Sequence, residues 1–151
     1  MIYFAYGSNM DAGQMRSRCP RASVIGVGKV SHYGLFFTRW SHSWDSATAD
    51  ILPERNKEVY GVLYDLPQED LKRMDQFADY PRSYIRQDVG VDFQGAILPA
   101  LTYVAMRQGV FLPSKTYLER MIVGAEGYHL PDHYIAFLRA IQTQDERQKN
   151  I

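Results

Sequence analysis

The feature that most constrains the fold is a short apolar segment at the start of the chain that ends at a glycine. Residues 2–6 alternate side chains that β-strands accept readily, and Gly7 gives the backbone the freedom that a tight turn requires. Ser8 and Asn9 are residue types that often cap a helix, and the polar segment 11–18 has the composition of a short helix. A strand, a turn and a helix start leave several backbone N–H groups pointing one way, which suits a carboxylate or another small anion. The spacing by itself favours an ordinary strand-to-helix turn without a ligand.

The chain as a whole has the composition of a single neutral globular domain, residues 1–151. Its 17 basic and 17 acidic residues cancel, so no overall charge attracts nucleic acid or an anionic membrane surface. No apolar run is long enough to cross a bilayer, and the N-terminus lacks the pattern of a signal peptide. The one cysteine, Cys19, excludes an intramolecular disulfide and is typical of a reducing compartment. We therefore expect a soluble cytoplasmic protein with no nucleic-acid or membrane partner.

Most of the remaining chain reads as β-branched and aromatic segments between turn signals. A polar and aromatic loop at 39–46 contains Trp40 and Trp44, which either line a pocket or cover one end of the sheet. Runs of strands with few intervening helices indicate an α+β fold, and we expect a mixed, largely antiparallel β-barrel with a few flanking helices. We predict its further strands at residues 24–30, 33–38, 47–52, 59–64, 84–91 and 98–106, with a charged turn at 53–57.

Three further helices are expected beside this barrel. One spans residues 68–75, and Ser114 has the position of a cap for a second helix that ends near residues 124–127. The polar residues 143–151 are expected to fray. The last helix begins near Pro131, and one of its faces carries Tyr134, Phe137, Leu138 and Ile141.

Isolated reactive side chains give only weak signals. His129 and His133 have the spacing of a helical metal pair, but Pro131 lies between them and no third ligand is evident, so surface histidines are the better interpretation. Ser8 and His42 match a hydrolase triad poorly, because the chain lacks a nucleophile-elbow sequence. The sequence therefore predicts neither a metal site nor a cofactor.

Four stretches of the chain together resemble the γ-glutamylcyclotransferase-like family. The first is the run Tyr-Gly-Ser-Asn at 6–9, directly after the first strand. The others follow in order: the segment 59–64, the segment 74–86, and a Pro-Ser-Lys-Thr-Tyr run at 113–117 with matching residues further along the same region. One motif alone would be weak, but four in register, covering the chain to about residue 141, are specific. The resemblance implies the barrel of that family.

The reaction of the family is intramolecular. The α-amine of a γ-glutamyl group attacks the side-chain carbonyl of the same group, which closes the ring of 5-oxoproline and releases the amine that was joined to it. Intramolecular attack of this kind is worth about 7–11 kcal/mol when the geometry is held. By resemblance, Tyr117 matches a substrate-binding tyrosine of the branch that acts on γ-glutamyl dipeptides. The substrate-binding residues implied are Tyr3, Phe4, Ala5, Tyr6, Gly7, Ser8, Asn9 and Tyr117.

The chain departs from the family pattern at one position. The family uses a glutamate just after a helix to move the proton, and Ala78 stands in its place, directly before Asp79. General acid–base catalysis is worth about 10²- to 10⁴-fold, so its loss should nearly silence turnover while the pocket persists. Three explanations stay open: a deliberately inactivated enzyme, a natural non-catalytic binder of γ-glutamyl compounds or small carboxylates, or a proton role taken by Asp79, Asp75 or another group. The expected partner is a small γ-glutamyl amine or peptide, and a homodimer is a possible assembly.

Overall fold

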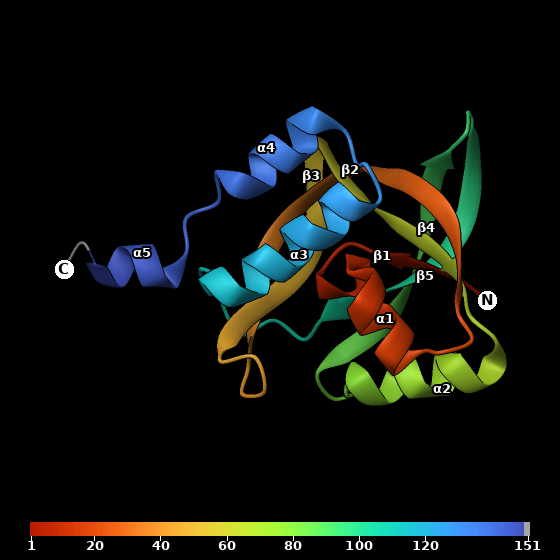
Figure 1. The fold of residues 1–151 in the computed structure, drawn as a ribbon, viewed down its shortest axis with the longest axis horizontal. Helices are drawn as coiled ribbons and strands as arrows, with labels where there is room; N and C mark the ends of the chain where they lie inside the picture. The colour runs from red at the N-terminus through yellow and green to blue at the C-terminus, as the bar shows by residue number, and fades with distance from the viewer. Residues whose placement is uncertain (150–151) are drawn as a thin grey trace.

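The computed structural model describes residues 1–149, and its strands close into a single barrel (Figure 1). Around the barrel the strands follow the order β1, β3, β2, β4, β5. β1 runs antiparallel to β3 and parallel to β5, so the barrel is mixed but largely antiparallel, as the sequence predicts. The bounds of the strands are β1 Ile2–Ala5, β2 Ser23–Ser41, β3 Ser46–Asp65, β4 Tyr84–Phe93 and β5 Ala96–Ala105.

Helices lie against the outside of this barrel (Figure 1). In Figure 1, α3 crosses the barrel between α1 and α4, α2 lies below the strands, and α5 extends away from the rest of the molecule. The helical elements are the 3₁₀ helix η1 Ser8–Met10, then α1 Ala12–Arg18, α2 Gln68–Phe77, α3 Lys115–Gly127, α4 Asp132–Arg139 and α5 Gln144–Lys149.

The largest difference from the sequence prediction lies in the two longest strands. Separate strands at 24–30 and 33–38 and a turn at 53–57 are predicted, but β2 and β3 continue through these regions. The loop predicted at 39–46 likewise shortens to a tight turn at 42–45. β2 and β3 therefore form one long curved hairpin, whose tip carries the two tryptophans.

A bulge explains why this hairpin resembles two shorter ones in the sequence. Strand pairing continues on both sides of His32, which faces the unpaired segment 54–57 of the partner strand. His32 and Asn56 have φ values of 63° and 64°, and the Asn56 N–H donates to His32 Nδ1 at 3.2 Å. His32 and the polar residues 54–57 thus interrupt the hydrogen-bond ladder between β2 and β3 locally, and neither strand ends there.

The N-termini of α1 and α3 are both capped by residue types that commonly cap helices. Only the cap of α3 is the residue that the sequence predicts. Asp11, rather than Ser8 or Asn9, caps α1 by accepting a hydrogen bond from the Gln14 N–H at 2.9 Å. The 3₁₀ turn of η1 delays the start of α1, which is why the cap moves along the chain. Ser114 caps α3 as predicted, because its Oγ accepts from the N–H three residues later at 3.1 Å.

The C-terminal helices differ in detail from the prediction. α4 buries Tyr134, Ile135 and Leu138 but leaves Phe137 47% exposed, so its buried face includes Ile135 instead of Phe137. Residues 144–149 form α5, whose first turn is held by a hydrogen bond from the Glu146 N–H to Thr143 Oγ1 at 3.3 Å. Asn150 and Ile151 lie outside the described residues, and fraying of the tail stays a prediction.

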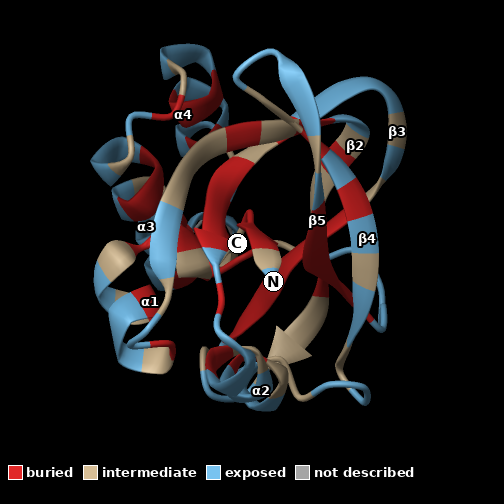
Figure 2. Ribbon diagram, turned by 90° about the vertical axis from the view of Figure 1, so that its right-hand side faces the viewer, coloured by how far each residue is buried: buried red, intermediate tan, exposed pale blue. Residues whose placement is uncertain are grey.

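The core lies inside the barrel and between the barrel and α3 (Figure 2). Figure 2 shows the buried positions, in red, gathered along the strands and on the face of α3 that turns toward them. A Cβ at Gly124 would lie 2.3 Å from the Met10 carbonyl carbon, so α3 and η1 meet through backbone atoms. Only glycine permits this approach, and it fixes the position of α3 relative to the turn that follows β1.

Candidate functional site

A pocket of about 550 Å³ opens where the end of β1, the tip of the β2–β3 hairpin, the C-terminal end of α2 and α3 meet. This volume is in the range of pockets that bind small molecules. Its walls combine aromatic rings with polar side chains and include the turn 6–9, Ala78, Asp79 and Tyr117. Segments that are far apart in the sequence therefore converge on one cavity.

Gly7 does not use the left-handed backbone region, but a side chain at this position would be crowded. Its φ of −109° is open to other residues, so the turn does not use the left-handed region that favours glycine. A Cβ at this position would lie 3.2 Å from Tyr117 Oη and 3.4 Å from Ala49 Cβ. The absence of a side chain lets the turn, β3 and α3 approach one another at the pocket wall.

The side chains of the turn are fixed by a hydrogen-bond network with α1. Gln14 Nε2 donates to Ser8 Oγ at 2.8 Å and to Asn9 Oδ1 at 3.0 Å. Asn9 Nδ2 in turn donates to Tyr3 Oη at 3.1 Å, and burial raises the pKa of Tyr3 to about 12. Tyr64 Oη donates to the Asn9 carbonyl at 3.1 Å. The turn is thus preorganised before any ligand arrives.

Tyr117 reaches across the pocket wall from the first turn of α3. Its hydroxyl oxygen accepts a hydrogen bond from the Ala49 N–H at 3.0 Å, so one polar partner of the hydroxyl belongs to the protein itself. Burial raises the pKa of Tyr117, and hydrogen bonds from Ala49 and Ser8 act in the opposite direction. Its ring meets Trp44 edge to face, with centroids 5.1 Å apart. Tyr117 therefore connects the hairpin tip, β3 and the turn.

Ala78 follows directly after α2 and lines the pocket with a methyl group only. The neighbouring Asp79 has φ of 49° and is committed to other partners. It accepts hydrogen bonds from Arg82 Nε at 2.9 Å, Arg82 Nη2 at 3.0 Å and Ser83 Oγ at 2.6 Å. These bonds from Arg82 and Ser83 lower the pKa of Asp79, which makes its carboxylate a weaker base.

Asp75 is likewise engaged, although a carboxylate near the C-terminal end of a helix meets an unfavourable dipole. It forms an ion pair with Arg86 and accepts a hydrogen bond from Tyr103 Oη at 2.5 Å. Burial and the bond to Asp75 raise the pKa of Tyr103, which lines the pocket. The two arginines on the segment after α2 thus offset both negative charges at this helix end.

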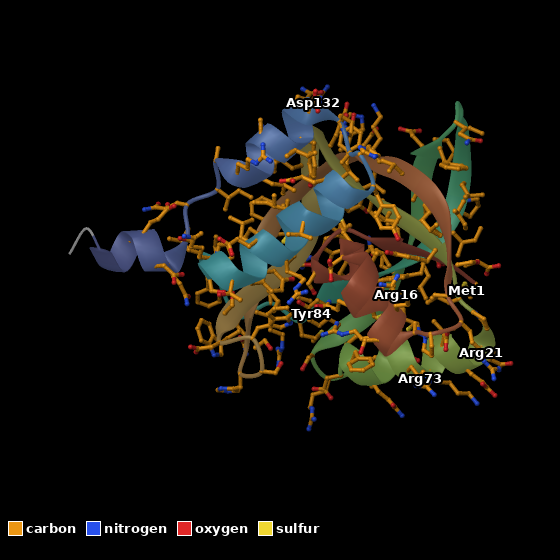
Figure 3. All side chains as sticks on the ribbon, viewed as in Figure 1. Met1, Arg16, Arg21, Arg73, Tyr84 and Asp132 are labelled. Carbon is orange, nitrogen blue, oxygen red and sulfur yellow. The ribbon has the colours of Figure 1, made fainter. Side chains whose placement is uncertain are left out.

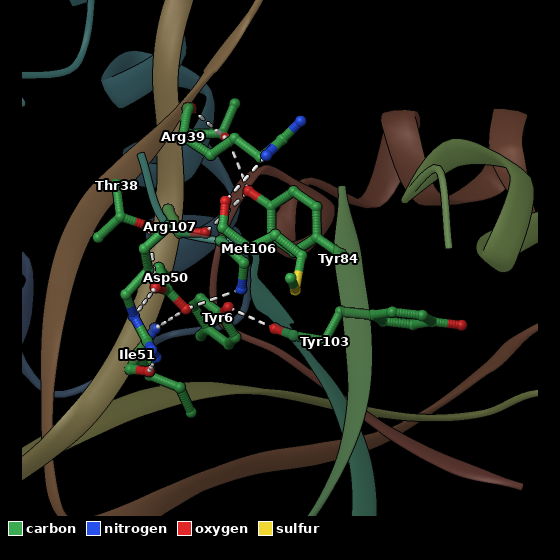
Figure 4. A network of polar contacts seen from close by, with 12 residues as sticks. Tyr6, Thr38, Arg39, Asp50, Ile51, Tyr84, Tyr103, Met106 and Arg107 are labelled. Atoms are coloured by element: carbon green, nitrogen blue, oxygen red, sulfur yellow. Dashed lines mark hydrogen bonds and ion pairs between the residues drawn. The ribbon is translucent and has the colours of Figure 1, made fainter. Parts of the chain in front are cut away.

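A buried aspartate that the sequence analysis missed holds one wall of the pocket together (Figure 4). Asp50 on β3 is fully buried and accepts hydrogen bonds from Thr38 Oγ1 at 2.8 Å, the Ala105 N–H at 3.0 Å and Arg107 Nε at 2.8 Å. The carboxylate thereby joins β2, β3 and the end of β5. The sequence does contain a signal for this network, namely one acidic residue within the otherwise largely apolar segment 47–52. A buried strand accommodates such a carboxylate only when polar groups surround it.

The structure gathers most, but not all, of the residues that the sequence analysis selects. Phe4 and Ala5 are buried in the core and do not line the pocket. The predicted residues that do line the pocket are Tyr3, Tyr6, Gly7, Ser8, Asn9, Ala78, Asp79 and Tyr117.

Other pocket residues were missed. Tyr84 donates to the Ala49 carbonyl at 3.1 Å, and burial raises the pKa of its hydroxyl. Arg18 lines the pocket from the end of α1, one helix turn after Gln14, so its helical spacing was the available signal. Ser8 and His42 both line the pocket, but the described residues 1–149 show no hydrogen bond between these two side chains. Ser8 Oγ instead accepts a hydrogen bond from Gln14 Nε2.

Within residues 1–149, no group of three or more side chains of the metal-ligating types is close enough to hold a metal ion. No helix in the same range is both long and apolar enough to cross a membrane.

The fold is a closed mixed barrel with a polar–aromatic pocket at the end of its first strand. The family model described as "Gamma-glutamyl cyclotransferase, AIG2-like" matches residues 3–121 of this chain. The chain therefore belongs to the γ-glutamyl cyclotransferase, AIG2-like family. The match covers the turn after β1, Ala78 and Tyr117.

Named relatives and solved structures agree with this assignment. A human γ-glutamylcyclotransferase is 27% identical over 150 residues, which cover 95% of this chain and 80% of the human protein. The bovine γ-glutamylcyclotransferase is also 27% identical, over 98% of this chain and 82% of its own length. A solved γ-glutamyl cyclotransferase structure superposes with a TM-score of 0.91 at 27% identity, covering 95% of this chain and 89% of the other. A Bacillus subtilis protein at 23% identity, with a TM-score of 0.79, covers 95% of this chain and 55% of its own, and shows the same fold.

Proposed function

We propose that the pocket binds a γ-glutamyl amine or peptide and that the chain has the active-site architecture of a γ-glutamylcyclotransferase. The observation that carries this proposal is the convergence of the turn 6–9, Ala78 and Tyr117 on one cavity. The turn and Tyr117 are positions at which the sequence resembles the family, and Ala78 is the position at which it departs from the family pattern. The relatives that bear the name γ-glutamylcyclotransferase support the same reaction class.

The proposed reaction closes a ring within the substrate. The α-amine nitrogen forms a bond to the γ-carbonyl carbon, the bond from that carbon to the leaving nitrogen breaks, and one proton moves from the attacking to the leaving nitrogen. The products are 5-oxoproline and a free amine. Because both reacting groups belong to one molecule, the protein has to hold a bent substrate, stabilise the developing oxyanion and move the proton.

The preorganised turn is suited to the first two tasks. Gln14 fixes the side chains of Ser8 and Asn9, and Tyr64 holds the Asn9 carbonyl, so the turn loses little further freedom when a ligand binds. We assign the backbone N–H groups of Gly7 and Ser8 to the substrate carboxylate and the oxyanion. Tyr117 is assigned to the wall that keeps the substrate bent.

The end of α2 offers no free carboxylate for the proton task. Ala78 carries no ionisable group, and Asp79 is held by Arg82 and Ser83 with a lowered pKa. The structure gives Asp75 similar partners in Arg86 and Tyr103. We therefore propose that the chain binds a γ-glutamyl compound and turns it over very slowly.

Two origins of such a chain can be separated by one observation. A glutamate codon at position 78 of the source gene would identify an inactivated enzyme. An alanine codon would identify a natural binding protein for γ-glutamyl compounds or small carboxylates, which is the second candidate function. A cytoplasmic location and a homodimer stay predictions, and light scattering after size-exclusion chromatography tests the second.

The first prediction is that Ala78→Glu creates or restores cyclotransferase activity. A carboxylate at the end of α2 would face the pocket that Ala78 lines, and general acid–base catalysis should raise the rate by about 10²- to 10⁴-fold. The measurement is the release of 5-oxoproline from a panel of γ-glutamyl amines and dipeptides. Ala78→Gln is the matched control, because glutamine has nearly the same shape as glutamate but no ionisable group. A folded Ala78→Glu protein that binds these compounds but releases no more 5-oxoproline than Ala78→Gln would refute the catalytic assignment.

A further inference from the structure

Arg18, in the last turn of α1, reaches into the pocket between the turn after β1 and the end of α2. Its Nη1 donates to Asn9 Oδ1 at 3.1 Å. Its guanidinium carbon lies 4.8 Å from the centre of the Phe77 ring, which precedes Ala78. The half-buried cation therefore has a fixed position next to both parts of the proposed site.

This guanidinium has no counter-charge in the described part of the chain. None of the ion pairs within residues 1–149 includes Arg18. The acidic groups that influence its pKa are the side chains of Tyr3, Tyr117 and Cys19. Burial raises the pKa of each of them, so they are neutral near pH 7.

A purely structural role does not account for this arrangement. Arg16, also in the last turn of α1, is exposed to solvent and already complements the dipole at this helix end (Figure 3). Arg18 uses one of its N–H groups for Asn9, whereas a guanidinium has five to donate. A partly desolvated cation with unused donors in a pocket is a site for an anion, and a carboxylate matches its planar geometry.

We propose that Arg18 binds the α-carboxylate of the γ-glutamyl group. This inference rests on the proposed function and adds the residue that recognises the negative charge. The contact with Asn9 places the cation beside the turn, so the turn and Arg18 can hold the same carboxylate from two sides. A carboxylate on the leaving group would lie toward the hairpin tip, where Arg39 lines the pocket.

The test compares two ligands that differ only in that carboxylate. 5-Oxoproline retains the α-carboxylate and has no leaving group, whereas 5-oxoprolinamide carries a neutral amide in its place. Calorimetry on the present chain should show at least tenfold tighter binding of 5-oxoproline. In Arg18→Met this preference should vanish, and in the matched control Arg16→Met it should equal that of the unmodified chain.

The outcomes separate the inference from the proposed function. If the unmodified chain binds neither 5-oxoproline nor any γ-glutamyl compound, the proposed function itself fails. If it prefers 5-oxoproline and folded Arg18→Met keeps that preference, the function stands and the role of Arg18 is wrong. An effect of Arg18→Met on γ-glutamyl peptides but not on 5-oxoproline would assign Arg18 to the leaving group and overturn the inference.

A second variant covers the case in which Arg18→Met does not fold. Arg18→Lys retains the charge but loses the planar pair of donors, and its preference for 5-oxoproline should fall several-fold. Thermal unfolding of each variant without ligand establishes that it is folded. An Arg18→Lys protein with an unchanged preference would overturn the assignment.

Discussion

Gly7 illustrates how a single residue supports the proposed pocket through the absence of a side chain. A Cβ there would already lie 3.2 Å from Tyr117 Oη, and the two methyl groups of valine extend further into the same space. We expect Gly7→Val to abolish binding of 5-oxoproline and γ-glutamyl compounds, as measured by calorimetry on the folded protein. Gly127→Val is the control, because no atom lies within 4 Å of a Cβ at that position. Unchanged affinity in folded Gly7→Val would remove the turn from the binding site.

Tyr117 gives a second prediction, in which the structure changes what the sequence suggests. From the sequence, Tyr117→Phe is expected to weaken ligand binding by about 0.5–1.5 kcal/mol with little effect on Tm. The structure shows the hydroxyl oxygen bonded to the buried Ala49 N–H, so its removal should also lower the free energy of unfolding by about 1–3 kcal/mol.

Urea unfolding and calorimetry measure these two effects separately. Tyr80→Phe is the control, since Tyr80 is 40% exposed and does not line the pocket. Equal stability of Tyr117→Phe and the unmodified chain would show that the bond to Ala49 contributes nothing. Equal ligand affinity would leave Tyr117 as a core residue.

At this scale the sequence identified the residues of the pocket better than their roles. The turn 6–9, Ala78 and Tyr117 were all selected, because short motifs preserve residue types at fixed spacing. Arg18 was missed because its importance arises from the lack of an acidic partner, and Asp50 because its partners are distant in the sequence. A sequence shows that an arginine is present, but not that it is half-buried without a carboxylate beside it.

At the scale of elements, the segment between α2 and β4 is held by charged pairs that depend on pH. The pKa of Asp79 is lowered in the folded protein, so its contribution to stability is present above the pKa of the unfolded state and is lost as the pH falls through the folded value. We expect Asp79→Asn to lower Tm near neutral pH and to have a shrinking effect below about pH 4.

Asparagine is the suitable replacement because it tolerates the positive φ of this position. The measurement is a series of thermal unfolding curves between about pH 2 and pH 7, with the exposed Asp88→Asn as the control. A difference in Tm that stays constant across this range would show that the Asp79 carboxylate is not its cause.

The elements also show where reading a sequence by local pattern fails. The bulge at His32 and the polar segment 54–57 look like breaks, because local residue types favour turns at both places. Pairing on either side nevertheless continues, since the flanking residues of β2 and β3 bury apolar side chains in the barrel. The cap at Ser114 was predicted correctly, because a helix cap depends only on neighbouring residues.

At the scale of the whole molecule, Asp50 connects three strands around the barrel. Replacing it with alanine leaves the Thr38 hydroxyl and the Ala105 N–H without their acceptor and Arg107 without its ion pair. Removing one partner of a buried pair is strongly destabilising, and we expect Asp50→Ala to lower the free energy of unfolding by about 3–5 kcal/mol.

The control for this prediction lies on the same strand. Asp65 forms an ion pair with the N-terminal amine, but its side chain is 61% exposed, so Asp65→Ala should cost less than about 1 kcal/mol. Urea unfolding of both variants measures the two costs. Similar costs for Asp50→Ala and Asp65→Ala would show that the buried network does not hold the barrel together.

The barrel was predictable as a class of fold, whereas the pair of strands that closes it was not. Aromatic and β-branched segments separated by turns indicate strands, and their excess over helices indicates a mixed barrel. The parallel pairing of β1 with β5 joins residues from opposite ends of the barrel sequence, and no local pattern encodes such a partner.

The pairing of β1 on both of its edges has a consequence for how the protein is made. Thr102 Oγ1 donates to the Phe4 carbonyl at 2.7 Å across 98 residues of sequence, so β1 obtains its second neighbour only after β5 has been synthesised. The turn that follows β1 forms part of the pocket, and so does Tyr117, which is synthesised later still. A nascent chain that ends before α3 therefore has no complete pocket. Ligand binding then reports that α3 has been synthesised and has folded onto the barrel, and 5-oxoproline should bind released chains but not chains stalled before α3.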